Sequence, residues 1–213
     1  MENEQLTEID LRNILCEVRK AHRLIHSFQQ RMMDLAKFIA TKLDMPLVYY
    51  VKWFSDGDIE KYDYGKIVSA WDFLGTYQGE HYFGEKKTGI YEYAICMLQC
   101  VDTGFFDAED NDKEDVTSFK GVNDASSKFI FYVHRIQKGS KWTQWDNRGE
   151  LYASKEYMKN EFTSKVINFK GKETILLYAF PMERFLDEQS TLKALQEFVD
   201  YTNRELKLDI EIH

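Results

Sequence analysis

The chain has 213 residues, a net charge of −8 and a sequence pI of about 5.2. Its hydrophobic share of 44% and aromatic share of 15% supply enough apolar material for a packed core, which excludes a disordered chain. The acidic balance argues against a nucleic-acid partner, because phosphate contacts need a basic surface. We expect a single domain over residues 1–213, with the first helix able to overhang it as an oligomerisation arm.

The cysteines and the opening residues bear on the cellular compartment. The odd, low count of Cys16, Cys96 and Cys100 predicts a reducing environment rather than a disulfide framework. The opening sequence MENEQLTEID is acidic and polar, unlike a secretory leader. No apolar run approaches the roughly 20 residues that span a bilayer. We therefore expect a cytoplasmic protein without a membrane partner.

Residues 8–43 are predicted to form one long helix. Apolar residues recur there at steps of three and four, at Leu11, Ile14, Val18, Ala21, Ile25, Phe28, Met32, Leu35 and Ile39. Thr7 is a suitable N-cap with Asp10 as its capping-box partner, and Pro46 ends the helix. A helix of about 36 residues is roughly 54 Å long, which exceeds the roughly 44 Å diameter of a domain of this size. The helix must therefore overhang, bend or pair.

The apolar stripe of this helix is wider than a simple coiled coil requires. Leu15, Leu24 and Phe38 stand at flanking positions where a two-stranded coiled coil carries charge. Two readings stay open, a helix buried in its own domain and a helix that contributes to a dimer interface. We expect the later turns, Phe28 to Leu43, to join the core and the earlier turns, Leu6 to Val18, to meet a second chain. The predicted interface residues are Leu11, Ile14, Leu15, Val18 and Ile25.

The remaining elements predict an α+β fold. Expected strands are Leu47–Phe54, Ile90–Cys100, Lys128–Gln137, Ser164–Phe169 and Glu173–Phe180, and the second and third of these are apolar on both faces and so central. Short helices are expected at Ile67–Leu74 and Ser154–Glu161, a final helix from an N-cap at Ser190, and a short edge strand at Leu208–Ile212. We expect a mostly antiparallel sheet of about five or six strands, packed on one face by the long N-terminal helix and the C-terminal helix.

An acidic stretch, residues 107–115, is the one low-complexity segment. Carboxylates in this number can bind a hard cation, but the spacing fails the EF-hand pattern because Gly121 stands where the bidentate glutamate belongs. A basic partner and a solvated loop are the other readings of this segment.

Histidines and cysteines do not form a recognisable catalytic or metal motif. His22 and His26 have zinc-binding spacing, but Arg23 replaces the glutamate of the zinc-protease pattern. Cys96 and Cys100 would face the same way on a strand at about 13 Å, too far apart for a disulfide. A pair between Cys96 or Cys100 and His134 on neighbouring strands is geometrically feasible without being marked by a motif. We expect no cofactor and no metal.

The most basic window of the chain offers a candidate ligand site. Arg135, Lys138, Lys141 and Arg148 alternate there with Trp142 and Trp145. Aromatic rings among basic side chains can stack on a base or hold a phosphorylated ligand. The alternative is a loop that its tryptophans attach to the core.

Function follows mainly from exclusion. The stripe, the acidic surface and the lack of catalytic motifs favour a non-enzymatic interaction or adaptor protein, homodimeric through the N-terminal helix or bound to another protein. A ligand- or nucleotide-binding module that uses Arg135, Lys141, Trp142, Trp145 and Arg148 is the first alternative. An enzyme with an unrecognised active site is the second.

Overall fold

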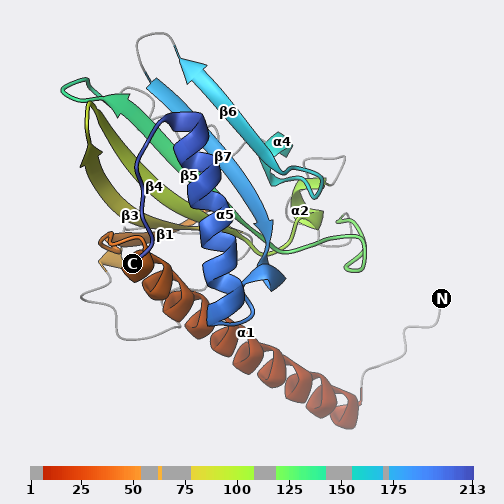
Figure 1. Ribbon diagram of the computed structural model, residues 1–213. Helices are drawn as coiled ribbons and strands as arrows, with labels where there is room; N and C mark the ends of the chain where they lie inside the picture. The colour runs from red at the N-terminus through yellow and green to blue at the C-terminus, as the bar shows by residue number, and fades with distance from the viewer. Residues whose placement is uncertain (1–6, 54–61, 64–77, 108–118, 143–154, 170–172) are drawn as a thin grey trace.

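The computed structural model describes residues 7–53, 62–63, 78–107, 119–142, 155–169 and 173–213, in which one antiparallel sheet carries two long helices on one face (Figure 1). The strand order is β2-β1-β3-β4-β5-β7-β6. The strands are β1 (Tyr49–Trp53), β2 (Tyr62–Asp63), β3 (Gln78–Thr88), β4 (Tyr91–Cys100), β5 (Lys128–Gln137), β6 (Ser164–Phe169) and β7 (Glu173–Pro181). The helices are α1 (Glu8–Lys42), α2 (Gly104–Asp107), α4 (Lys155–Met158), the 3-10 helix η3 (Met182–Phe185) and α5 (Glu188–Leu206). The α+β class is confirmed, with six longer strands and the two-residue β2.

The two strands predicted to be central are central. β4 lies between β3 and β5, and β5 lies between β4 and β7. The bounds of β5 are those predicted, and those of β4 differ by one residue. Both strands carry continuous apolar runs because side chains on both of their faces are buried.

β3 contains a bulge, at Gly84. The register with β4 shifts between Tyr82 and Glu85, and Gly84 there has a φ of 85°. A Cβ at Gly84 would lie 2.9 Å from the ring of Pro46, so only glycine fits both this backbone conformation and this close approach. The strand continues beyond the bulge to Thr88.

The sheet has a separate core on each face. The face under α1 and α5, here the helix face, packs Ile95, Met97 and Phe131 against helix residues such as Ile39 and Phe198. Phe131 and Phe198 have ring centroids 4.5 Å apart. The opposite face packs residues of β4, β5 and β7 against the short helices α2 and α4, at Cys96, Leu98, Tyr132, Leu177, Phe106 and Met158.

α1 is the predicted long helix, and only its later half belongs to the core. Thr7 and Asp10 form the predicted capping box. Its buried residues are Gln29, Met32, Met33, Ala36, Ile39 and Ala40, which confirms that the later turns pack on the sheet. The earlier turns extend away from the sheet (Figure 1).

The last helix begins before the predicted N-cap. The N-cap is Asp187, whose carboxylate accepts a hydrogen bond from the backbone N–H of Ser190 at 2.7 Å, so the prediction of Ser190 as N-cap was wrong. Ser190 completes a capping box by accepting from the N–H of Asp187 at 3.0 Å. Ser190 therefore serves the same helix start from inside the first turn.

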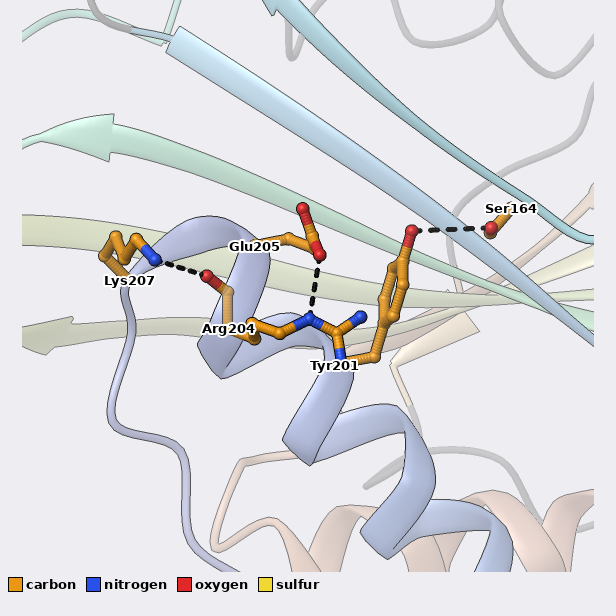
Figure 2. A network of polar contacts seen from close by, with 5 residues as sticks. All are labelled: Ser164, Tyr201, Arg204, Glu205 and Lys207. Carbon is orange, nitrogen blue, oxygen red and sulfur yellow. Dashed lines mark hydrogen bonds and ion pairs between the residues drawn. The ribbon is translucent and has the colours of Figure 1, made fainter.

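The C-terminal turns of α5 are held over β6 by polar contacts (Figure 2). The hydroxyl of Tyr201 donates to Ser164 of β6 at 3.4 Å. Lys207, in the left-handed conformation, ends the helix and donates from Nζ to the carbonyl of Arg204 at 2.9 Å. The guanidinium of Arg204 pairs with Glu205 at 2.9 Å.

The tail after α5 is not a strand, which corrects the prediction for Leu208–Ile212. The backbone of Ile210 bonds to the side chain of Asn203 and not to a neighbouring strand. This side chain donates to the carbonyl of Ile210 and accepts from the Ile210 N–H, both at 2.9 Å. Leu208 and Ile210 are buried in the helix-face core, which explains their alternating pattern. The N–H of His213 donates to the carbonyl of Lys42 at the end of α1.

The helix predicted at Ile67–Leu74 and most of the acidic stretch at 107–115 lie outside the described residues. The short helix expected at Ser154–Glu161 corresponds to α4, and the strand at Leu47–Phe54 corresponds to β1. None of the helices in the described part of the chain combines the length and the hydropathy needed to cross a membrane.

Candidate functional site

The first half of α1 presents apolar side chains away from the core. Within this segment, Glu8–Ile25, here called the arm, every residue is exposed except the partly buried Cys16. The five predicted interface side chains are each 43–51% exposed and form what we call the stripe: Leu11, Ile14, Leu15, Val18 and Ile25. Soluble proteins seldom leave so contiguous an apolar surface unless something binds it. Leu24 and Ile9, beside the stripe, are more exposed still.

The stripe continues the face by which α1 packs on its own sheet. Val18, Ile25, Met32 and Ile39 follow one another at steps of seven and so share one side of the helix. The first two are nearly half exposed, whereas Met32 is 5% and Ile39 is 0% exposed. One apolar side of the helix is therefore covered by the sheet over its later turns and left open over the arm.

The arm has local means of remaining helical away from the sheet. Besides the capping box, Arg12 pairs with Glu8 and Lys20 pairs with Glu17, each at 2.7 Å. The hydrogen bonds from Thr7 hold the pKa of Asp10 below its usual value, which favours a negative charge at the positive end of the helix dipole. Each exposed pair contributes only about 0.3–0.5 kcal/mol, and together they favour the helical state.

A chain of buried amides fixes the point at which α1 leaves the sheet. Gln29 is the first buried residue of α1, and its Oε1 accepts from Gln99 of β4 at 3.3 Å. Gln99 in turn lies 3.3 Å from Nε2 of His81 on β3. Burial lowers the pKa of His81 to about 4, so this imidazole is neutral at physiological pH. The turns of α1 from Gln29 onward are anchored on the sheet. The arm lies before this point in the chain.

Among the described residues of the predicted ligand site, Arg135 and Trp142 lie against opposite faces of the sheet. Arg135 lies on the helix face, where its guanidinium donates to the carbonyl of Leu206 and, at 2.9 Å, to Thr174, and lies over the ring of Tyr91. Trp142 packs against the core of the opposite face. Lys141 is exposed, while Trp145 and Arg148 lie outside the described residues. Arg135 serves as an α5 C-terminal cap, a role the basic pattern did not reveal.

The opposite face carries buried polar pairs that sequence reasoning did not identify. Nε2 of His134 lies 3.3 Å from Oε2 of Glu173, and the Sγ of Cys96 donates to Oε1 of Glu80 at 3.4 Å. The edge of Trp142 meets the His134 ring at 5.1 Å between centroids. An imidazole beside a carboxylate can hold a proton between them. The signal that could have found this cluster is the shared parity of these positions along β3, β4, β5 and β7.

Cys96 and His134 share the opposite face but are not directly paired. Cys96 faces Tyr132 across the ladder, and His134 faces Ala94, so the two lie diagonally. Such diagonal neighbours are typically 7–8 Å apart between Cα atoms. Cys96 and Cys100 are both buried, and neither forms a disulfide with another described cysteine. His22 lies in the arm, and His26 is the first residue after it. No cluster of three metal-binding side chains occurs among the described residues.

A family match covers almost the whole of this architecture. Family PM0109 matches residues 8–207, from the first residue of α1 to the cap of α5. The chain belongs to the PM0109 family. The match includes the arm, so the arm is part of the region by which the PM0109 family is defined. No curated protein matches the chain, and no solved structure matches it either.

Proposed function

We propose that this member of the PM0109 family is a protein–protein interaction module that forms a homodimer through the arm. The observation that supports this most directly is the stripe, five half-exposed apolar side chains on a helix that the sheet leaves uncovered. Apolar residues at steps of three and four are the pattern by which helices pair. Dimerisation would remove the stripe from water while leaving the sheet and its two cores unchanged.

The decisive experiment measures the oligomeric state of the full chain by light scattering over a micromolar concentration range. We expect a dimer, which Ile14→Asp converts to a monomer because the new carboxylate would be buried unpaired in the interface. The matched control is Asn13→Asp, which adds the same charge one residue away on the exposed side of the same helix. The control should remain dimeric. A wild-type chain that stays monomeric over this range would contradict homodimerisation.

A ligand-binding role for the opposite face is the second candidate. It is favoured by the buried His134–Glu173 pair with Trp142 beside it. Binding of a small molecule there would change the fluorescence of Trp142, so titration with a panel of nucleotides tests the idea. A change in the wild-type chain that disappears in Trp142→Phe would support a site at this face. An unchanged signal would count against it.

A further inference from the structure

We propose that the two arms pair antiparallel, crossing near Val18, so that the two sheets lie at opposite ends of the paired helices. This inference rests on the proposed dimer and adds its geometry. It is based on where the sheet lies relative to the stripe and on the order of charges along the arm.

The sheet restricts the ways in which two arms can pair. The stripe shares its side of α1 with Met32 and Ile39, and the sheet covers that side over the later turns. A second helix laid along the stripe therefore meets the first protein's own sheet at about Gln29. In a parallel pair, both sheets would occupy the same space between the two helices. In an antiparallel pair, the partner's helix begins near that point, so the two sheets are apart.

The arm is long enough for the two stripes to overlap over their whole length. Glu8–Ile25 rises roughly 27 Å, or about five turns, before the core begins. Antiparallel overlap of this length places Leu11 of one chain beside Ile25 of the other, with Val18 of each at the crossing point. Each half of the stripe then covers the opposite half of its partner, and the two-fold axis of the pair passes by Val18.

The charges of the arm are unevenly divided between its two halves. The first half carries Glu8, Asp10 and Arg12, and the second half carries Glu17, Arg19, Lys20 and Arg23, so the halves have net charges of −1 and +2. Antiparallel pairing brings the acidic half of one chain alongside the basic half of the other. Parallel pairing would align the basic turns with each other. The charge order thus favours the same orientation as the steric argument.

Spin-label distances distinguish the two orientations. Single labels are introduced as Arg19→Cys and Lys37→Cys in a Cys16→Ser background, leaving the buried Cys96 and Cys100 in place. Both sites are exposed and lie on one side of the helix. With the crossing at Val18, the two Arg19 labels are offset along the axis by roughly 3 Å and the two Lys37 labels by roughly 57 Å.

We expect a short distance between Arg19 labels and a much longer one between Lys37 labels, measured by double electron–electron resonance. Short distances at both sites would overturn the antiparallel orientation and leave the dimer standing. A monomer by light scattering with no intermolecular distance at either site would overturn both proposals. Adding Ile14→Asp to each labelled chain should abolish the distances, and their persistence would place the contact outside the arm.

Discussion

At the scale of single residues, the polar groups under α1 govern where the helix is fixed. Gln29, Gln99 and His81 form one buried line from the helix to two strands. These residues could not be identified from the sequence, because the identity of a polar residue in a strand does not show whether its side chain faces water or a core. Only the register of β3 against β4, which pairs His81 with Met97 and Gly79 with Gln99, places them together.

His81 should make the stability of the protein depend on pH. Its pKa is about 4 when folded and 6.5 in its ordinary state, so the unfolded chain binds more protons between these values. Stability from this group is therefore complete above pH 6.5 and falls as the pH drops, by about 2 kcal/mol at pH 5. Urea denaturation at neutral pH and at pH 5 should show this loss, and His81→Gln should reduce it by that amount.

The control for this effect is His213→Gln, at an exposed side chain outside both the core and the arm. This variant should keep the pH dependence of the wild-type chain. An equal reduction in both variants would mean that His81 is not the titrating group.

At the scale of elements, the parts that could be predicted are those whose pattern has one structural solution. Long runs that are apolar on both faces give β4 and β5, and the heptad steps give α1. The tail at Leu208–Ile212 failed because alternation of apolar residues is shared by an edge strand and by a coil packed on a core. The hydrogen bonds from Asn203 hold the tail as coil. Asn203 lies seven residues from Ile210, so the alternation of residues 208–212 could not reveal its role.

Asn203→Ala should release this tail. The substitution removes both hydrogen bonds to the Ile210 backbone and leaves those groups unpaired, at a cost of about 1–3 kcal/mol. Hydrogen exchange should rise over residues 208–213 while α5 stays protected. Gln196→Ala is the matched control, because that exposed amide bonds only to Asp200 among the described residues. If the two variants exchange alike, Asn203 does not hold the tail.

At the scale of the whole molecule, one apolar side of α1 packs on the sheet over its later turns and is exposed over the arm. Its length could be predicted from the sequence, and so could the division between core turns and overhanging turns. The exact boundary could not, because it depends on where the sheet ends, and that in turn depends on strand order. The same dependence on strand order places two of the candidate ligand residues, Arg135 and Trp142, against opposite faces of one sheet.

Two aspartate substitutions on the same side of α1 should separate these environments. Ile39 is fully buried, so Ile39→Asp places an unpaired charge in the core and should unfold the domain, at a cost above about 4 kcal/mol. Ile25 is 45% exposed, so Ile25→Asp should dissociate the dimer and leave the fold intact. Circular-dichroism melting and a sizing run on each variant measure both outcomes. Unfolding by Ile25→Asp would show that the arm is part of the core.

The contact between the end of α1 and the tail has a consequence for biosynthesis. Lys42 receives a hydrogen bond from His213, and Leu208 and Ile210 complete the core that α1 joins. At about 5–20 residues per second, the ribosome adds the intervening residues in roughly 10–30 s. α1 is therefore synthesised well before Leu208 and Ile210, and the core that it joins is complete only after they have been added. Until then, the part of the helix-face core that Leu208 and Ile210 fill is open to chaperones.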